Sequence, residues 1–301
     1  MRGITPRREQ GMADPVLASM VRAMGLENAP HYTAATPKIQ AYRDRWAQLA
    51  PSRDGPVASR RHEVSDPAKM TKQIKAKGME LGANMVGACR LQPHMIDLGA
   101  DVPHEFVIAA CVAEDYEKVL QGANAVEEEA MRVYAKCAEI ATDLAAYVRE
   151  LGYPARAHHN GASEVQAIPI FYQVGFGELG RHGSLINKKY GASFRPGFVT
   201  TELPMVEDQP SEFGVQDFCM NCNVCQLNCP GDAIPQDHVV THGIKRWLID
   251  LEKCYPYSRL RDEYCHLCVD VCPYIVQSHP ETYKAFMKRR RQVGYKAPTS
   301  W

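Results

Sequence analysis

Cysteines dominate the residues of this 301-residue chain that could carry chemistry. Eight of the eleven cysteines lie between Cys219 and Cys272. The first four form the run Cys219-Met-Asn-Cys222-Asn-Val-Cys225-Gln-Leu-Asn-Cys229-Pro230. In a C-x₂-C-x₂-C-x₃-C-P run, three thiolates bind one cubane iron–sulfur cluster and the fourth binds a second cluster. The spacing therefore predicts two 4Fe–4S clusters.

The remaining four cysteines form a looser motif. Cys254 stands eleven residues before Cys265, and Cys268 and Cys272-Pro273 follow. The crossed pattern of ligation predicts two sets of ligands, which are Cys219, Cys222, Cys225 and Cys272 for cluster one, and Cys229, Cys254, Cys265 and Cys268 for cluster two. The alternative is a pair of four-cysteine zinc sites, but the C-x₂-C-x₂-C-x₃-C-P run is not typical of zinc sites.

Two clusters in one segment make an electron relay, and the rest of the chain must use it. A free-standing ferredoxin needs little more than the cysteine segment, whereas more than 200 residues precede Cys219 here. This excess predicts a catalytic or cofactor-binding domain that the clusters supply with electrons. The other three cysteines, Cys89, Cys111 and Cys137, lie in apolar segments, so we expect them to pack in the core.

Composition excludes several classes of protein. Lys plus Arg equals Asp plus Glu, so the formal net charge is zero, which argues against a protein built to bind nucleic acid. No apolar run reaches the ~18 residues of a membrane-spanning helix. Arg7 and Arg8 form a twin-arginine pair, but no apolar stretch follows them, so no export signal is expected. We therefore predict a cytoplasmic protein without a membrane span.

Hydrophobic periodicity outlines an α/β (or α+β) domain before the cysteines. It predicts a helix from Asp66 that Gly82 ends, strands over 84–91 and 104–112, and a long helix over 127–151. The second strand is expected to be central. Residues 168–174 fit a helix or a strand, and 198–203 a strand. The predicted division is an arm with short helices over 1–65 (one near 15–24), a catalytic domain over 66–210, a two-cluster domain over 211–282 and a basic tail over 283–301.

The order of these parts resembles the corrinoid- and iron–sulfur-dependent reductive dehalogenases and their relatives, the epoxyqueuosine reductases. The resemblance covers about 70–280, and it rests on four stretches beside the first cysteine run, which are Gly82-Ala-Asn-Met-Val-Gly87, Gly175-Phe-Gly-Glu-Leu-Gly-Arg-His-Gly183, Arg195 through Thr200-Thr-Glu-Leu-Pro204, and Asp250-Leu-Glu-Lys-Cys254. The epoxyqueuosine reductases tend to carry G-L-G-W-x-G-K in the glycine-rich stretch, so its form here favours the dehalogenases.

The resemblance implies a nitroreductase-like α/β domain that holds base-off cobalamin, followed by a bacterial-ferredoxin-like domain with two 4Fe–4S clusters. No D-x-H-x-x-G motif is present, in agreement with base-off binding. The resemblance also implies that the glycine-rich stretch approaches the corrinoid, through Gly175, Gly177, Gly180, Arg181 and Gly183. The alternative is a set of glycines that only form turns.

The resemblance further implies a tyrosine that donates a proton, beside a cation that favours its phenolate. Tyr134 on the long helix matches the donor, Arg195 the cation and Asn160 a polar contact to the substrate. A core tyrosine and a surface arginine are the alternatives, and Lys188 and Lys189 are competing cations. His159 is a second candidate proton donor. No carboxylate stands in His158-His159-Asn160, although an acid is expected near 160 in the epoxyqueuosine reductases.

Three functions follow from this interpretation. The first is a cobalamin-dependent reductive dehalogenase that removes halide from an organohalide, with electrons from a separate ferredoxin, flavodoxin or reductase. The second is an epoxyqueuosine reductase-like enzyme that acts on tRNA. The third is a non-enzymatic iron–sulfur subunit that passes electrons to a partner.

Overall fold

The computed structural model describes residues 36–119, 121, 123–160, 162–241, 244–258 and 265–275. The short helix expected near 15–24 and the basic tail expected over 283–301 lie outside the described residues. Among the described helices, none combines the length and the apolar character that crossing a lipid bilayer requires.

Helices and strands alternate over the first two thirds of the described chain, and short elements follow. In chain order they are α2 (Pro37–Leu49), η1 (Ala50–Ser52), α3 (Pro67–Glu80), β1 (Met85–Arg90), η2 (Pro93–Met95), β2 (Phe106–Ala113), α4 (Tyr116–Val119), α5 (Ala123–Glu150), β3 (Ala155–His158), α6 (Ala167–Gln173), β4 (Glu178–Leu179), β5 (Leu185–Ile186), β6 (Phe194–Thr201), α7 (Val215–Asn221), α8 (Val224–Leu227), β7 (Val239–Thr241), β8 (Ile244–Arg246), α9 (Leu251–Ser258) and α10 (Leu267–Asp270).

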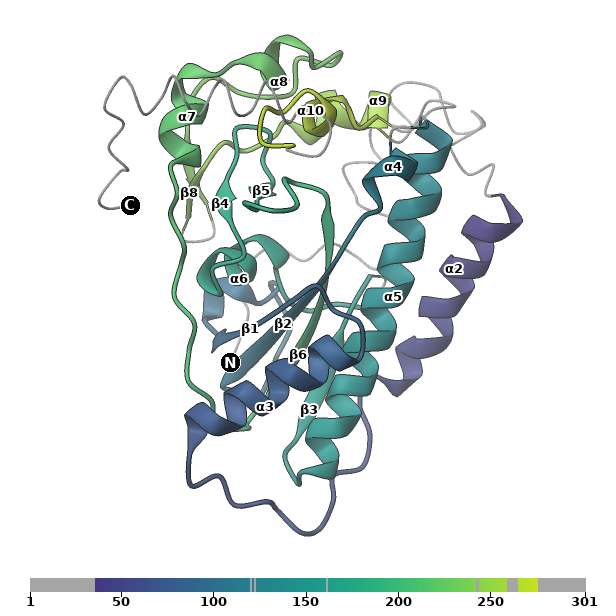
Figure 1. Ribbon diagram of the computed structural model, residues 1–301, viewed down its shortest axis with the longest axis vertical. Coiled ribbons are helices and arrows are strands. Elements are labelled where there is room, and N and C mark those ends of the chain that lie inside the picture. The colour runs from purple at the N-terminus through teal and green to yellow at the C-terminus, as the bar shows by residue number, and fades with distance from the viewer. Residues whose placement is uncertain are drawn as a thin grey trace.

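A four-stranded sheet with the order β1-β2-β6-β3 forms the centre of the fold (Figure 1). Its strand pairs are all antiparallel. The prediction that β2 is central is confirmed, because β2 pairs with both β1 and β6. The four-residue strand β3 was not predicted, since so short a segment carries almost no periodic signal.

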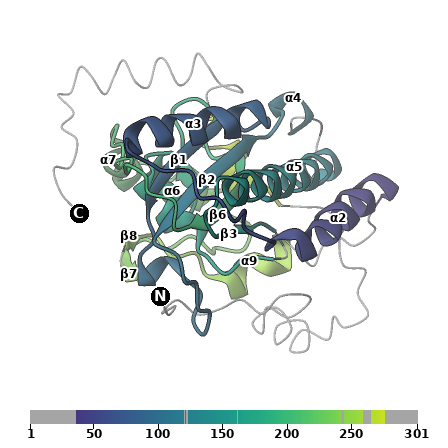
Figure 2. The same ribbon diagram turned by 90° about the horizontal axis from the view of Figure 1, so that it is seen from below.

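Each face of the sheet is covered by helices (Figure 2). Helices α3 and α5 pack on one face through a core that includes Ile74 of α3 and Leu144 of α5. The short α6 covers the other face, where Phe171 packs against Phe194 and Phe198 of β6. Cys89 and Cys111 are buried in the core beneath α6, and Cys137 of α5 is buried in a smaller cluster with Val112 of β2, which confirms the expected packing role.

The helix signals in the sequence are confirmed at α3 and α5. The Asp66 side chain caps α3, because it accepts a hydrogen bond of 3.0 Å from the Lys69 backbone N–H. Helix α5 ends just before Gly152, whose φ of 84° lies in the left-handed region that favours glycine. Segment 168–174, which fitted either a helix or a strand, belongs largely to the helix α6.

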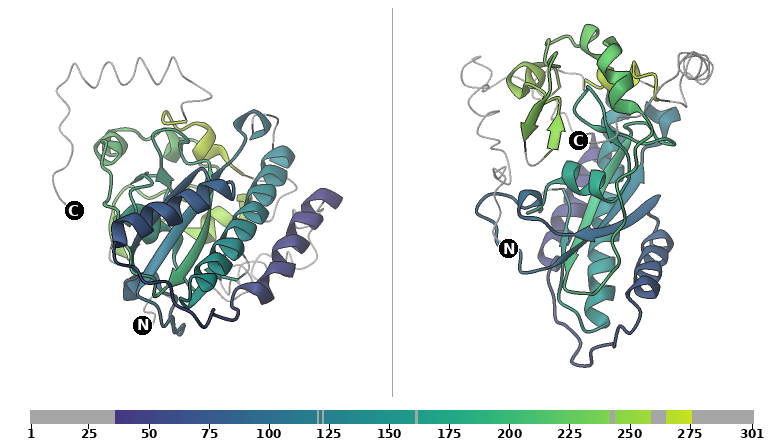
Figure 3. Two further views of the ribbon diagram at one scale, coloured as in Figure 1. Left: turned by 60° about the horizontal axis from the view of Figure 1, so that its bottom comes forward. Right: turned by 90° about the vertical axis from the view of Figure 1, so that its left-hand side faces the viewer.

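The cysteine-rich elements gather at one end of the sheet (Figures 1 and 3). Val119 of α4, which follows β2, packs in one core with Phe218 and Trp247 of the cysteine-rich part. A strap over residues 203–214 connects β6 to α7 and runs along the edge strand β1. Asp208 of the strap donates its backbone N–H to Ala88 O of β1 at 2.8 Å. Because α4 comes shortly after Ala113, the end of the sheet that carries Ala113 and Phe194 faces the cysteines.

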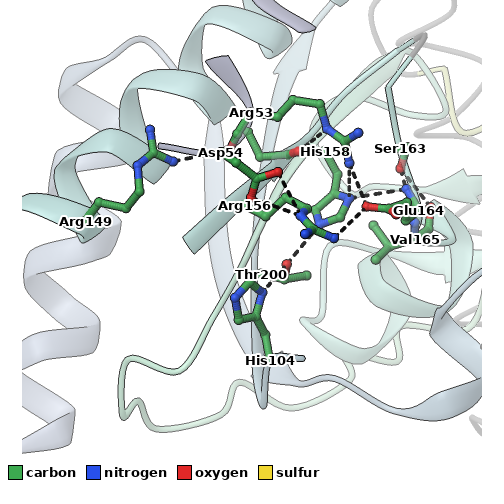
Figure 4. Close-up of polar contacts among 11 residues, drawn as sticks. Arg53, Asp54, His104, Arg149, Arg156, His158, Ser163, Glu164, Val165 and Thr200 are labelled. Carbon is green, nitrogen blue, oxygen red and sulfur yellow. Dashed lines mark hydrogen bonds and ion pairs between the residues drawn. The ribbon is translucent and has the colours of Figure 1, made fainter. Parts of the chain in front are cut away.

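A polar network fastens the segment after η1 to the edge strand β3 (Figure 4). Glu164 lies 2.9 Å from Arg53 and 3.1 Å from Arg156, and Arg156 also donates to Asp54 at 3.0 Å. The Arg53 carbonyl accepts a hydrogen bond of 2.9 Å from the Ala157 backbone N–H. The charges compensate one another, as the burial of such groups requires.

Two neutral histidines, His158 and His104, extend the network to Thr200 of β6. His158 Nδ1 accepts from the Glu164 backbone N–H at 3.2 Å, so His158 donates from Nε2 to Thr200 Oγ1 at 2.9 Å. The Thr200 hydroxyl then donates to His104 Nδ1 at 2.8 Å. Burial, together with the nearby Arg156 charge, lowers the pKa of His104 to about 4. Burial also lowers the pKa of His158 far below its ordinary value.

We predict that the end of the sheet around His104 and Thr200, opposite the end that faces the cysteines, loosens in mild acid. Between about pH 6.5 and pH 4 an unfolded His104 binds a proton that the folded one does not, so stability falls as the pH falls. At pH 5 the loss from His104 alone is about 2 kcal/mol, and the buried His158 adds to it. Hydrogen exchange of the β6 amides at pH 5 and pH 7 measures the loss. His104→Asn keeps the hydrogen bond to Thr200 and should make the dependence less steep, whereas the exposed His62→Asn should not. An equally steep dependence in His104→Asn would contradict the assignment.

Candidate functional site

The first predicted set of cysteines is brought together at the end of the sheet. Cys219 lies in α7, Cys222 caps the end of α7 and Cys225 lies in α8. Cys272 joins them from the far end of the segment, because it lies in one buried cluster with Cys219, against which Cys222 packs. These are the four thiols that sequence spacing assigns to cluster one.

The second predicted set gathers in the same way. The Cys265 thiol interacts with Cys254 and Cys229, and the Cys268 thiol with Cys265, Cys254 and Cys229. Cys268 also interacts with Cys225 of the first set, so the two groups are neighbours. The described part of the chain holds no three His, Cys, Asp or Glu side chains arranged around a single ion. The two sets are thus defined by which cysteines lie near one another, and not by the arrangement of their sulfur atoms around a metal.

Burial differs between the two sets. Taken as whole residues, three cysteines of the first set are buried, whereas all four of the second are partly exposed. Burial raises the pKa of Cys219 and of Cys268 to about 12 and that of Cys225 to about 11. Thiolates crowded in this way need positive charge nearby, which iron would supply. The donor set therefore fits iron–sulfur clusters, with the first set deeper than the second.

Helix α7, which carries Cys219, is held at its N-terminus by a buried carboxylate. Glu178 of β4 is 1% exposed. It accepts hydrogen bonds from the backbone N–H groups of Gly214 at 2.7 Å and Val215 at 3.1 Å, and a third from Phe213. Burial raises the pKa of Glu178, and these hydrogen bonds oppose the rise. The carboxylate satisfies N–H groups that the helix leaves unpaired.

The other end of α7 is held by Arg181, which is also 1% exposed. Its Nε donates to the Cys219 carbonyl at 2.9 Å, and its Nη2 lies 3.4 Å from the Met220 carbonyl. Nη1 reaches the carbonyls of Pro235 at 3.3 Å and Gln236 at 3.1 Å. The β4–β5 hairpin thus places an anion at the start of α7 and a cation at its end.

The glycines predicted to bind the corrinoid pack against the chain itself. Gly175 has a φ of 74°, and a Cβ there would lie 2.5 Å from the Gln209 carbonyl of the strap. A Cβ on Gly177 would lie 2.3 Å from the Ile186 carbonyl, while Gly180 and Gly183 meet side chains of isoleucines. Close packing of the hairpin accounts for these glycines, and their role toward a corrinoid stays a prediction.

Tyr134 and Arg195 are brought together at the end of the sheet that faces the cysteines. The Arg195 guanidinium carbon lies 5.5 Å from the centre of the Tyr134 ring, within the range of a cation–π contact. Trp46 of α2 packs edge-on against the same ring, with centroids 6.3 Å apart. Arg195 is held by the buried Glu114, whose Oε1 lies 2.6 Å from Arg195 Nη2.

Asn160 and His159 follow β3 at the same end of the sheet. Continuing the antiparallel register, in which His158 faces Phe198, puts residue 160 beside the start of β6. His159 is buried and its Nδ1 donates to the Asn160 carbonyl at 3.0 Å. The competing cations lie elsewhere, since Lys188 stands over the Phe213 ring and Lys189 over the Tyr190 ring.

Sequence reasoning missed two buried carboxylates of this site, Glu114 and Glu178. Glu114 directly follows a continuous apolar strand, and Glu178 stands within the glycine-rich stretch. An exposed acid is unusual at either position, and this was the signal in the sequence that the two carboxylates are buried. Their arginine and helix partners lie far away in the chain, so only the fold identifies them.

Comparisons with known proteins agree with this arrangement. The family described as "4Fe-4S dicluster domain" matches residues 218–276. Tetrachloroethene reductive dehalogenase of Desulfitobacterium hafniense is 29% identical over 219 residues, covering 68% of this chain and 38% of that protein. Epoxyqueuosine reductase of Cyclobacterium marinum is 31% identical over 122 residues, covering 38% of each.

A solved structure extends the similarity to nearly the whole chain. The catabolic reductive dehalogenase NpRdhA, in complex with 3-bromo-4-hydroxybenzoic acid, matches with a TM-score of 0.80 and 28% identity, over 97% of this chain and 48% of that one. The chain thus spans less than half the length of these two dehalogenases. It is a homologue of the reductive dehalogenases, more distantly related to the epoxyqueuosine reductases, with a 4Fe–4S dicluster domain in its C-terminal part.

Proposed function

We propose that this chain is a cobalamin-dependent reductive dehalogenase that removes halide from an organohalide. The observation that carries the proposal is the Tyr134 ring beneath the Arg195 guanidinium, at the end of the sheet that faces the two cysteine sets. The reaction consumes two electrons and one proton: R–X + 2e⁻ + H⁺ gives R–H + X⁻. The chain therefore needs an electron path, a proton donor and a place for an anion.

The cysteines supply the electron path in this proposal. Cys219, Cys222, Cys225 and Cys272 hold one 4Fe–4S cluster, and Cys229, Cys254, Cys265 and Cys268 hold the other. Electrons from a separate ferredoxin, flavodoxin or reductase enter at the second set, because its thiols are the more exposed. The deeper first set then passes them toward the sheet.

Buried polar atoms support a further group between the sheet and the cysteines. His182 Nδ1 accepts from the Ser184 backbone N–H at 3.2 Å, so its Nε2 carries a proton. That Nε2 is buried without a hydrogen-bond partner among the described residues, and so is Nε2 of His159. Buried polar atoms are nearly always paired, so each of these atoms is a candidate contact for a bound group such as base-off cobalamin. When bound, cobalamin would supply the cobalt centre at which the carbon–halogen bond is reduced.

The side chains at the end of the sheet have separate tasks. The Tyr134 hydroxyl donates the proton that replaces the halogen. Arg195 favours the tyrosinate left behind and attracts the departing halide, and Glu114 fixes the direction of its guanidinium. Asn160 contacts the substrate. A cytoplasmic location stays a prediction.

The epoxyqueuosine reductase alternative is supported by the 31% identity over 122 residues. An acid expected near residue 160 is not supplied by Glu164, because Arg53 and Arg156 already bind that carboxylate. An anaerobic assay decides between the dehalogenase, the epoxyqueuosine reductase and the electron-transfer subunit. The reconstituted protein should show corrin absorption and release halide from a panel of haloaromatics without reducing epoxyqueuosine. Epoxyqueuosine reduction alone would favour the tRNA enzyme, and clusters without corrin an electron-transfer subunit.

Replacing the proton donor should stop turnover without disturbing the cofactors. Tyr134→Phe keeps the ring beneath Arg195 and removes only the hydroxyl, so we expect halide release to fall by roughly 10²-fold or more. Tyr147→Phe, on the same helix at a hydroxyl that accepts from Gln73, serves as the control and should keep its rate. Full activity of Tyr134→Phe, with corrin and iron content unchanged, would rule out this tyrosine as the donor.

Removing the outlying ligand should remove one cluster. Cys254→Ala takes a thiolate from the second set only, so we expect the iron and sulfide content to fall to about half, with the first cluster still visible by EPR. Cys89→Ala, which removes a buried thiol from the core of the sheet, should keep its iron. The proposed ligand sets would be wrong if Cys254→Ala retained both clusters.

A further inference from the structure

Arg181 is a buried cation without a carboxylate partner in the described part of the chain. Arg195 is paired with Glu114 at 2.6 Å, and Arg132 with Glu129 at 2.6 Å. Arg181, by contrast, forms its hydrogen bonds with backbone carbonyls and, at 3.4 Å, with Gln226 Oε1. A full charge that is 1% exposed and lacks an opposite charge is costly. The position therefore suits an anion that the bare protein does not contain.

The neighbours of Arg181 indicate which anion this is. Its guanidinium donates to the carbonyl of Cys219, the first predicted ligand of cluster one, and contacts the next residue. Trp247 closes the other side, with the guanidinium carbon 4.9 Å from its ring centre. A cluster bound by four thiolates carries net negative charge, which becomes more negative on reduction.

The hydrogen bonds of Arg181 lie along the first cysteine run. Nε donates to the Cys219 carbonyl at 2.9 Å, Nη2 lies 3.4 Å from the carbonyl of the next residue, and Nη1 lies 3.4 Å from Oε1 of Gln226, which directly follows Cys225. The guanidinium therefore lies beside the first set.

We propose that Arg181 is a positioning residue that sets the reduction potential of the cluster held by Cys219, Cys222, Cys225 and Cys272. Its buried charge stabilises the reduced cluster, so the cluster accepts an electron more readily than it would beside a neutral side chain. The inference rests on the clusters of the proposed function, but not on the substrate or on halide release.

Potentiometric titration of the reconstituted full chain, followed by EPR, tests the proposal. In Arg181→Gln we expect the equilibrium constant for reduction of this cluster to fall at least tenfold, a shift of about 59 mV to lower potential. Arg181→Lys keeps the charge and should shift it by less than half as much. Arg90→Gln removes an exposed arginine of β1 and should leave the potential unchanged.

A second variant keeps the test decisive if Arg181→Gln fails to assemble its clusters. Gln226→Glu puts a carboxylate beside the intact guanidinium and offsets its charge, so the potential should again fall. A change of less than threefold in the equilibrium constant in Arg181→Gln, or in Gln226→Glu where the first variant cannot be measured, would overturn the proposal. A wild-type protein with both clusters but no halide release would contradict the proposed function and leave this titration valid.

Discussion

The attachment of helix α7 to the β4–β5 hairpin is the constraint on which the rest of the structure depends. Glu178 satisfies the N–H groups at the start of the helix, and Arg181 binds the carbonyls at its end. Both contacts complement the helix dipole, and both are buried. Because α7 carries Cys219 and leads to Cys222, the hairpin fixes the first cysteine set relative to the sheet. Electron transfer between two parts of one chain requires such a fixed separation.

The same hairpin explains why the glycine-rich stretch tolerates so few side chains. The strap approaches Gly175 so closely that a Cβ would meet the Gln209 carbonyl, and the partner strand approaches Gly177 in the same way. The strap also pairs with β1 through Asp208. Sheet, strap, hairpin and α7 therefore form one continuous packed unit.

The sequence was most informative where the signal was local. The spacing of Cys219, Cys222, Cys225 and Cys229 predicted that these thiols lie close together, because three steps of fixed length admit few geometries. Which thiols share a cluster stays a prediction. The periodicity of α5 and the apolar run of β2 predicted the layers of the domain. Where β3 pairs, and which residue Glu178 or Glu114 contacts, depended on tertiary packing between segments distant in the chain. Tyr134 and Arg195 were matched through a family resemblance, and the fold brings them together, but their chemistry stays a prediction.

The partly buried Arg195 and the buried Arg181 are compensated in opposite ways, and the difference follows the charges each must meet. Glu114 neutralises Arg195 within the protein, which holds the guanidinium over Tyr134 even when no anion is bound. Arg181 has only carbonyl dipoles, an amide oxygen and the Trp247 ring around it, so its charge is left for the cysteine set beside it. In the proposed function a halide is present only during turnover, whereas a thiolate-bound cluster is negative at all times. A permanent anion suits an unpaired arginine and a transient one suits an arginine that is already paired, because an unpaired buried charge is tolerated only where its partner stays.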